Sequence, residues 1–410
     1  MDTSAANRTA VNRILVAKGL RAFGDGYVSL LLPLYLLELG YSPLDVGILA
    51  TATLLGSGVL ALGVGLAAHR FHYRALLLAA AALMAATGAG FASVSAFWPL
   101  LLIAVVGTLN PSSGDVSVFL PLEHAMLSRL VEDRERTAVF ARYSLVGSVM
   151  AAVGALAAAW PSIAAQELGI AQRAAMQAMF ALYAAIGLAT LQVYRGLPRA
   201  PMGEQRVNAP LTQSKGRVHA LAALFAVDAF GGGLIVQSML ALWLYQRHGL
   251  TPGEVGTVFF FTSMLAALSY LIAVRIADRI GLVNTMVFTH IPANLCLVAI
   301  PFVDGFGALV ALFLVRSLLS QMDVPTRSSY VMAIVRPEER PAAASITSVP
   351  RSLASAASPS LTGYMLALSP FGWPFVLAGA IKIAYDVMLL VTFGKVRPPE
   401  ESGGVPPRAG

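Results

Sequence analysis

Twelve long apolar runs constrain this chain more than any other feature of its sequence. A helix that spans a bilayer needs about 20 mostly apolar residues. Composition agrees, because 57% of the residues are hydrophobic and only 12% are charged, whereas soluble proteins have about 25% charged residues. The sequence therefore predicts an all-α membrane protein with twelve transmembrane helices, at 14–40, 44–67, 73–94, 97–127, 136–160, 171–195, 217–247, 253–276, 281–303, 306–333, 341–368 and 372–394.

The net charge of +7 and the absence of catalytic motifs narrow the classes of function. Basic residues occur in short clusters between apolar runs, a pattern that fits an anionic membrane surface and not nucleic acid. The single cysteine, Cys296, excludes an intramolecular disulfide. We find no phosphate-binding G-x-x-x-x-G-K loop, metal-ligand cluster or nucleophile elbow. We therefore expect no enzyme, no cofactor, no metal and no self-contained ATP-driven pump.

An eight-residue motif occurs twice in the chain. Gly40–Gly47 (GYSPLDVG) returns as Gly249–Gly256 (GLTPGEVG), which is 209 residues later, from 40 to 249. A second motif, Val131–Ala138 (VEDRERTA), returns as Val335–Ala342 (VRPEERPA), 204 residues later, from 131 to 335. Two motifs that recur at nearly the same spacing indicate two copies of one structural unit. The function is expected where the two copies meet.

The repeat divides the chain into two six-helix bundles. We predict an N-terminal bundle at 1–195, a polar linker at 196–216, a C-terminal bundle at 217–395 and a disordered tail at 396–410. Most lysines and arginines fall on one side of the predicted spans, in the N-terminal segment, the linker, the tail and alternate loops. By the positive-inside rule this side is cytoplasmic, so both termini of a cell-membrane protein are expected in the cytoplasm.

Loop and helix motifs extend this pattern. After span 2 the chain reads Gly65-Leu66-Ala67-Ala68-His69-Arg70, and after span 8 it reads Ala277-Asp278-Arg279-Ile280-Gly281. Glu-Arg pairs precede spans 5 and 11, and span 11 contains Ser358-Pro359-Ser360-Leu361-Thr362-Gly363. With a 6 + 6 arrangement and a central linker, these motifs resemble the major facilitator superfamily over nearly the whole chain.

The resemblance implies roles for the motif residues. It makes Arg70, Asp278, Arg279 and Gly281 a cytoplasmic gate, in which Asp278 pairs with arginines of a neighbouring helix in one state and releases them in the other. The alternative is a basic loop that only sets topology. Pro359 and Gly363 are similar to a motif of the family's antiporters. The resemblance also implies a monomer, a cavity lined by helices 1, 4, 7 and 10, and lipid-facing helices 3, 6, 9 and 12.

Ionisable residues inside spans are the candidates for the translocation path, because each costs roughly 3 kcal/mol on insertion scales. Asp25, Asp115, Asp228 and Arg316 fall on spans 1, 4, 7 and 10, one on each helix that the resemblance assigns to the cavity. Arg351 lies on span 11 without an obvious local partner. A buried carboxylate can load and release protons as access alternates, so Asp25, Asp115 and Asp228 are candidate proton carriers.

Structural interpretations of these charges remain open at this stage. Asp228 and Arg316 could form a fixed ion pair. Lys382 with Asp386, and Arg21 with Asp25, have the i, i+4 spacing of pairs within one helix. Two small-residue segments, Asn110–Gly114 and Gly231–Gly233, are expected to interrupt spans 4 and 7, either at a binding site or at a close helix contact.

The predicted function is secondary active transport of a small molecule by alternating access, with proton-coupled efflux by antiport as the first interpretation. Its partners would be the substrate, protons and the lipid bilayer. One alternative is an organic-anion transporter that uses Arg316 and Arg351. A second alternative is a sensor or scaffold that has the same fold and transports nothing.

Overall fold

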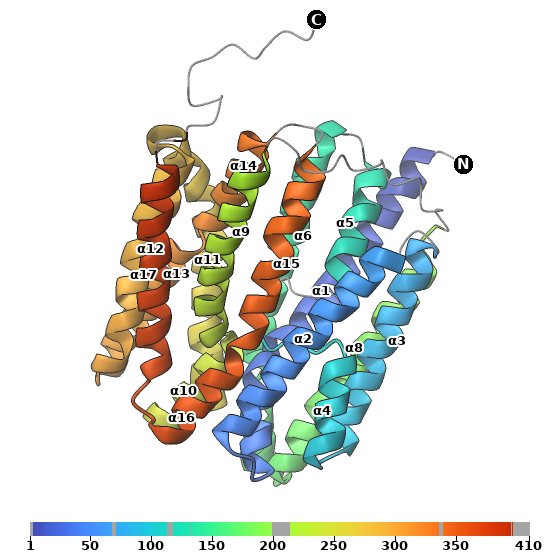
Figure 1. Cartoon of the computed structure of the whole chain (residues 1–410). Helices are drawn as coiled ribbons and strands as arrows, with labels where there is room; N and C mark the ends of the chain where they lie inside the picture. Colours follow the sequence, from blue (N-terminus) through green and yellow to red (C-terminus); the bar gives the residue numbers. More distant parts are fainter. Residues whose placement is uncertain are drawn as a thin grey trace, which may run out of the picture. The chain divides into compact units, whose positions relative to one another are not determined.

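The computed structural model describes residues 3–67, 71–112, 118–131, 133–198, 214–335, 339–394 and 396, and within them the chain is helical and contains no strand. Figure 1 shows that nearly all of the described chain forms helices. The first half forms α1 (Thr3–Glu38), α2 (Pro43–Ala67), α3 (Tyr73–Ser93), α4 (Phe97–Val106), α5 (Phe119–Leu130), α6 (Asp133–Ala157), α7 (Trp160–Leu168) and α8 (Gln172–Arg195). The second half forms α9 (Lys215–Leu234), α10 (Gln237–His248), α11 (Pro252–Ile280), α12 (Leu282–Ala299), a 3₁₀ turn η2 (Ile300–Phe302), α13 (Phe306–Ser320), α14 (Asp323–Ile334), α15 (Arg340–Ala357), α16 (Pro359–Leu368) and α17 (Trp373–Phe393).

The helices confirm the all-α membrane fold and follow the predicted spans closely. Nine spans of the described residues are long and apolar enough to cross a membrane, which is consistent with the predicted twelve. Several predicted spans consist of two helices in sequence. Span 4 breaks between α4 and α5, where Asn110–Gly114 predicted an interruption, and span 7 breaks between α9 and α10, directly after Gly231–Gly233. Helix α7 lies in a segment that we predicted as a loop.

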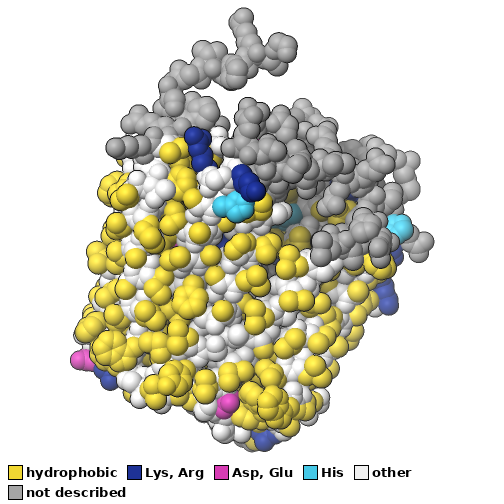
Figure 2. All heavy atoms as spheres, in the orientation of Figure 1, with side chains coloured by type: hydrophobic (Ala, Val, Ile, Leu, Met, Phe, Trp, Pro, Cys, Tyr) yellow, Lys and Arg dark blue, Asp and Glu magenta, His cyan; other side chains and the backbone are white. Residues whose placement is uncertain are grey.

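Hydrophobic side chains cover most of the face seen in Figure 2, and charged side chains lie toward its two ends. Many large apolar residues are exposed, including Trp98, Leu102, Phe261, Leu295 and Val391. Exposed apolar surface on this scale is unfavourable in water and is expected where lipid is the solvent. The outer surface therefore supports the membrane assignment independently of helix length.

The chain divides into two compact units. Unit 1 contains Met1–Gln205, Val236–Ser263 and Pro359–Pro370, and unit 2 contains Arg206–Ile235, Met264–Ser358 and Phe371–Gly410. Unit 1 thus combines most of the first half with α10, the start of α11 and α16. The predicted bundle boundaries stay a prediction, and most of the predicted linker and tail lies outside the described residues.

Aromatic side chains fill the interior of each unit. In unit 1 the ring of Phe180 packs against Tyr35 and Phe91, with centroids 5.0 and 5.4 Å away. In unit 2 a buried apolar cluster joins α9, α12, α14 and α17, and includes Phe225 and Tyr385. These contacts hold the helices that carry the buried charges at defined rotations about their axes.

The repeated eight-residue motif forms the same helix start twice. Gly40 and Gly249 have positive φ angles of 87° and 62°, in the left-handed region that glycine adopts without strain. Ser42 and Thr251 then cap the next helix. The backbone N–H of Ser42 donates to Asp45 Oδ2 at 2.9 Å, and that of Thr251 donates to Glu254 Oε2 at 2.8 Å. The motif is therefore a helix stop followed by a capping box.

The last glycine of each motif copy lies against the backbone of another helix in unit 1. A Cβ on Gly47 would lie 2.5 Å from the carbonyl oxygen of Pro359, and a Cβ on Gly256 would lie 2.3 Å from that of Ala155. These contacts are equivalent, because 47 and 256 are related by the 209-residue repeat and 155 and 359 by the 204-residue repeat. Gly363 also packs here, with its Cα 3.0 Å from a Cβ placed on Gly47. The residues of the antiporter-like motif thus have a packing role at the α2–α16 contact.

We predict that Gly47→Ala lowers the free energy of unfolding by about 1–3 kcal/mol, the usual cost of overpacking, because the added methyl group meets backbone that cannot rotate away. Gly58→Ala on the same helix is the matched control, since a Cβ there meets no atom within 4 Å. Thermal unfolding in detergent measures both variants. Equal stability of the two variants would contradict the close contact.

Candidate functional site

Unit 1 buries an ion pair between α1 and α5. The guanidinium of Arg21 donates to Glu123 Oε2, and Glu123 is completely buried. Tyr143 on α6 and Tyr194 on α8 donate to the same carboxylate at 2.5 and 2.6 Å. The arginine also lies 4.0 Å from the ring centroid of Phe119. One cation and two hydroxyl donors therefore neutralise the completely buried Glu123 carboxylate and satisfy its hydrogen bonds.

Asp25 does not form the i, i+4 ion pair with Arg21 that the sequence left open, since Arg21 pairs with Glu123. Its Oδ1 accepts instead from the hydroxyl of Tyr183, 3.2 Å away on α8, and no cation of the described residues lies within ion-pair distance. The Tyr183 hydroxyl is also 3.2 Å from the carbonyl oxygen of Thr108, in the break between α4 and α5. The half-buried Asp25 carboxyl group is therefore connected to a tyrosine that has a second acceptor available.

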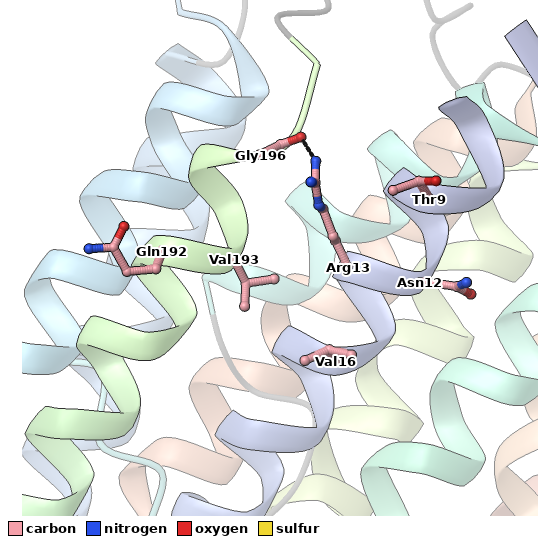
Figure 3. Close-up of a pocket in the computed structure, with 7 residues that line it drawn as sticks. All are labelled: Thr9, Asn12, Arg13, Val16, Gln192, Val193 and Gly196. Carbon is pink, nitrogen blue, oxygen red and sulfur yellow. Dashed lines mark hydrogen bonds between the residues drawn. The ribbon is translucent and has the colours of Figure 1, made fainter. Parts of the chain in front are cut away.

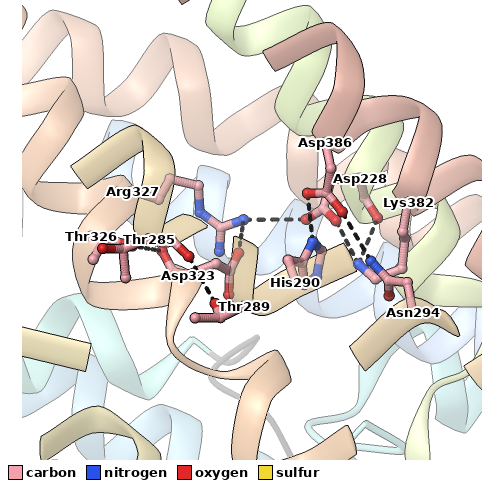
Figure 4. Close-up of polar contacts among 10 residues, drawn as sticks. All are labelled: Asp228, Thr285, Thr289, His290, Asn294, Asp323, Thr326, Arg327, Lys382 and Asp386. Carbon is pink, nitrogen blue, oxygen red and sulfur yellow. Dashed lines mark hydrogen bonds and ion pairs between the residues drawn. The ribbon is translucent and has the colours of Figure 1, made fainter. Parts of the chain in front are cut away.

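Unit 2 contains a larger buried network, centred on Asp228 of α9 (Figure 4). Lys382 of α17 donates to Asp228 Oδ1, and Arg327 of α14 lies 3.2 Å from Oδ2. The same arginine nitrogen is 3.1 Å from Asp323. Asp228 therefore does not form the ion pair with Arg316 that the sequence left open, because both of its oxygens are already engaged by other cations.

The network continues through α12 and α17. His290 Nδ1 lies 2.8 Å from Asp386 Oδ1, and the amide of Asn294 donates to Asp386 Oδ2 at 3.2 Å. The predicted Lys382–Asp386 pair within α17 is therefore wrong. Lys382 and Asp386 both point into unit 2 and are at most 7% exposed, although the resemblance assigned their helix to lipid. They bind partners on α9 and α12 in place of each other.

Arg316 and Arg351 are two arginines of unit 2 that form no ion pair with the described residues of this network. The Nε of Arg316, on α13, is buried and has no hydrogen-bond partner within the described part of the chain. Arg351 is exposed on α15. Neither arginine forms an ion pair with a described residue.

The remaining predicted site residues give a mixed outcome. Asp278 and Arg279 are exposed in the last turn of α11, and Gly281, with a φ of 87°, separates α11 from α12. No ion pair of Asp278 is present among the described residues, so its gate role stays a prediction. Arg70 and Asp115 lie outside the described residues.

A separate pocket of 310 Å³ lies between α1 and α8 in unit 1. Figure 3 shows Arg13 beside it, donating to the carbonyl oxygen of Gly196 just after the end of α8. Its other lining groups are mostly short or amide side chains of the two helices, namely Thr9, Asn12, Val16, Gln192 and Val193. The carboxylates of Asp25 and Glu123 do not line this pocket.

Sequence reasoning missed three members of the buried clusters. Glu123 lies inside predicted span 97–127, so the rule that buried charges are functional could have selected it. Arg327 lies inside predicted span 306–333, so the same rule could have selected it, and His290 lies on span 281–303, which the resemblance assigned to lipid. The described residues contain no group of histidine, cysteine, aspartate or glutamate that could hold a metal ion.

A helical chain with an apolar exterior and paired charges in its interior is a multi-pass membrane protein. The model of the Major Facilitator Superfamily matches residues 14–315 and 221–410. The chain therefore belongs to the Major Facilitator Superfamily, and its fold is that of a membrane transporter and not of an enzyme.

Individual relatives are distant. The uncharacterized membrane protein YJR124C of Saccharomyces cerevisiae is 24% identical over 91% of this chain and 92% of its own length. A variant of the nucleoside transporter NupG has a TM-score of 0.75 at 13% identity, covering 94% of this chain and all of NupG. A bacterial homolog of the human lysosomal transporter Spinster, inward-facing and occupied, has a TM-score of 0.70 at 14% identity, with 93% and 94% coverage. The human organic anion transporter MFSD10 has a TM-score of 0.62 at 16% identity, covering 93% of this chain and 99% of MFSD10. These likenesses show the shared fold.

We predict that Arg21→Met lowers the free energy of unfolding by about 3–5 kcal/mol, because it leaves the buried Glu123 carboxylate without a cation. The double variant Arg21→Met/Glu123→Gln should recover most of that loss, since no charge remains. Unfolding in detergent measures both. A double variant as unstable as the single variant would contradict a role for the uncompensated charge.

Proposed function

We propose that this protein is a proton-coupled secondary transporter that exports a small molecule in exchange for protons. It acts by alternating access as a monomer in the cytoplasmic membrane, with both termini in the cytoplasm. The clustering of arginine and lysine on one side of the spans supports this orientation. The antiporter-like residues Pro359 and Gly363 support exchange over uptake. The observation that carries proton coupling is the hydrogen-bond arrangement at Asp25.

Asp25 and Tyr183 accommodate both charge states of the carboxyl group. When Asp25 is ionised, the hydroxyl of Tyr183 donates to it across 3.2 Å. When Asp25 is protonated, it can donate to the tyrosine oxygen, and the tyrosine proton can turn to the carbonyl oxygen of Thr108, also 3.2 Å away. Each state satisfies its donors, so a proton can bind and leave without stranding a polar group.

Asp25 suits proton carriage better than Asp228 does. Lys382 and Arg327 neutralise Asp228, and protonating it would leave two buried cations with one partner fewer. Asp25 has no such cation within ion-pair distance among the described residues. We therefore assign proton carriage to Asp25 first, keep Asp115 as a second carrier, and give Asp228 the role of holding α9, α14 and α17 together.

Alternating access needs close helix contacts that can separate without breaking buried ion pairs. The contacts of Gly47 and Gly256 have this character, because they join backbone to backbone and involve no charged group. The ion pairs described above instead join buried charged side chains, which would lose their partners on separation. The molecule can therefore use the glycine contacts as the surfaces that open.

Asp25→Asn should abolish substrate-dependent proton movement while leaving the protein folded, because the amide keeps the Tyr183 contact but cannot release a proton. The assay uses proteoliposomes with an imposed pH gradient, a pH dye inside, and a mixed library of cationic drugs and organic anions. Tyr183→Phe should slow proton movement without abolishing it.

The matched control is Asp45→Asn, which removes a partly exposed carboxylate at the start of α2. This control should behave as the unmodified protein does. Proton movement that survives in Asp25→Asn would exclude Asp25 as the carrier. Substrate flux without proton movement in the unmodified protein would exclude proton coupling itself.

A second candidate function, transport of an organic anion, is favoured by Arg316. Its buried Nε lacks a partner among the described residues, and Asp228 does not neutralise it. A carboxylate or phosphate on a substrate would supply both the hydrogen-bond acceptor and the negative charge. Arg351, on α15 of the same unit, adds a second cation without an ion-pair partner among the described residues.

For this candidate, Arg316→Ala should reduce the flux of organic anions from the library, and Arg316→Lys should restore part of it through charge alone. Arg217→Gln, which removes an exposed cation in the first turn of α9, is the control. Competition experiments then separate the substrate classes. Anion flux that is unchanged in Arg316→Ala would rule out this site.

A further inference from the structure

We propose that the pocket between α1 and α8 binds the headgroup of an anionic phospholipid, with the lipid phosphate at Arg13 and an acyl chain over Val16 and Val193. The pocket lies within unit 1 and shares no residue with the buried ion-pair networks. The proposal therefore depends neither on proton coupling nor on the identity of the transported substrate.

Arg13 forms the polar end of the pocket. Its guanidinium donates to the carbonyl oxygen of Gly196, just after the end of α8, and this bond holds the side chain across the space between the two helices (Figure 3). Most N–H groups of the guanidinium stay available after this single bond. Arg13 is exposed and forms no ion pair with a described residue. A phosphate fits the remaining donors, because its oxygens can accept two parallel hydrogen bonds from one guanidinium.

The two helices that form the pocket do not balance its positive charge. Arg8 lies further toward the N-terminus of α1, and Arg195 in the last turn of α8 donates to the lining residue Gln192 at 3.0 Å. These arginines and Arg13 are all exposed. Within its described length α1 contains no acid before Asp25, and α8 contains none. Basic clusters at the end of a span attract anionic lipids, so the charge favours an anionic headgroup over a zwitterionic one.

The other end of the pocket is apolar and continues into exposed hydrophobic surface. Val16 and Val193 lie below Arg13 in Figure 3, and Val16 is 53% exposed. Leu188, about one turn before Gln192 on α8, is 57% exposed. A free phosphate would leave this apolar surface uncovered, whereas a phospholipid covers it with an acyl chain while its phosphate binds the arginine. A cation beside apolar surface therefore selects an amphiphile.

A lipid in this pocket would contact both helices at once. Arg13 and Val16 belong to α1, and Val193 and Gly196 belong to α8 and its end. A ligand that binds the folded protein and not the unfolded chain raises stability by mass action. Bound anionic phospholipid should therefore stabilise the packing of α1 against α8.

The test adds phosphatidylglycerol to the full-length protein in detergent micelles and measures retained lipid by native mass spectrometry. The unmodified protein should retain phosphatidylglycerol in preference to phosphatidylcholine with the same acyl chains, and its thermal unfolding should move to higher temperature. Arg13→Gln and Arg195→Gln should each weaken this binding about fivefold, since one arginine contributes roughly 1 kcal/mol near an anionic lipid surface. Arg195→Gln keeps the bond between Arg13 and Gly196, so it gives an answer even if Arg13→Gln fails to fold.

The matched control is Arg173→Gln, which removes an exposed arginine at the opposite end of α8. This variant should bind phosphatidylglycerol as the unmodified protein does. A loss as large as that in Arg195→Gln would mean that any surface cation attracts the lipid, and would overturn the site. Unchanged binding in both Arg13→Gln and Arg195→Gln would also overturn it. Equal retention of phosphatidylcholine would contradict the role of charge, and equal stabilisation by inorganic phosphate would replace the lipid by a free anion. No step uses a substrate or a pH gradient, so failure of proton-coupled transport gives a different result.

Discussion

An ionised side chain inside a bilayer needs a counter-charge, hydrogen-bond partners or water, and this constraint organises the interior of the protein. Glu123 is completely buried and is bound by Arg21, Tyr143 and Tyr194 from three different helices. Asp228 is bound by Lys382 and Arg327 from two others. In each unit the charges therefore hold helices together at one rotation, and the apolar packing of Phe180 or Phe225 fills the space between them.

The need of a buried ion for a partner also distinguishes charged residues with a structural role from those that are candidates for function. A carboxylate between two cations, such as Asp228, is costly to protonate because its partners would lose their neutralisation. A carboxyl group bound by a neutral hydroxyl, such as Asp25 on Tyr183, can exist in both states. Arg316 has a buried nitrogen without a partner in the described chain, which is why we propose it for an external anion.

The pseudo-symmetric repeat supplies helix contacts of a different kind, without charged groups. Each copy of the eight-residue motif ends one helix at a left-handed glycine, starts the next with a capping box, and presents a glycine to the backbone of a further helix. Contacts of this type depend on close packing and dispersion and not on charge. Separating the two helices therefore leaves no charged group without its partner. The sequence repeat therefore produces two equivalent glycine contacts, one at Gly47 and one at Gly256.

Sequence alone determined the helices, because the signals are local. Apolar runs located the spans, Asn110–Gly114 and Gly231–Gly233 marked the breaks in spans 4 and 7, and the repeat indicated the internal symmetry. The site was only partly predictable. Asp25, Asp228 and Arg316 were correctly found within helical spans, whereas the pairs assigned by i, i+4 spacing, Arg21–Asp25 and Lys382–Asp386, were wrong.

Tertiary structure decided the partners, because buried ions choose the best-placed counter-charge from any neighbouring helix. Arg21 and Glu123 are 102 positions apart, and Lys382 and Asp228 are 154 positions apart. A helix presents residues i and i+4 on one face, but that spacing gives no information about what the face meets. The rotation of each helix is set by packing around aromatic residues such as Phe225 and Tyr385, and this rotation turned Lys382 toward α9 and Asp386 toward α12.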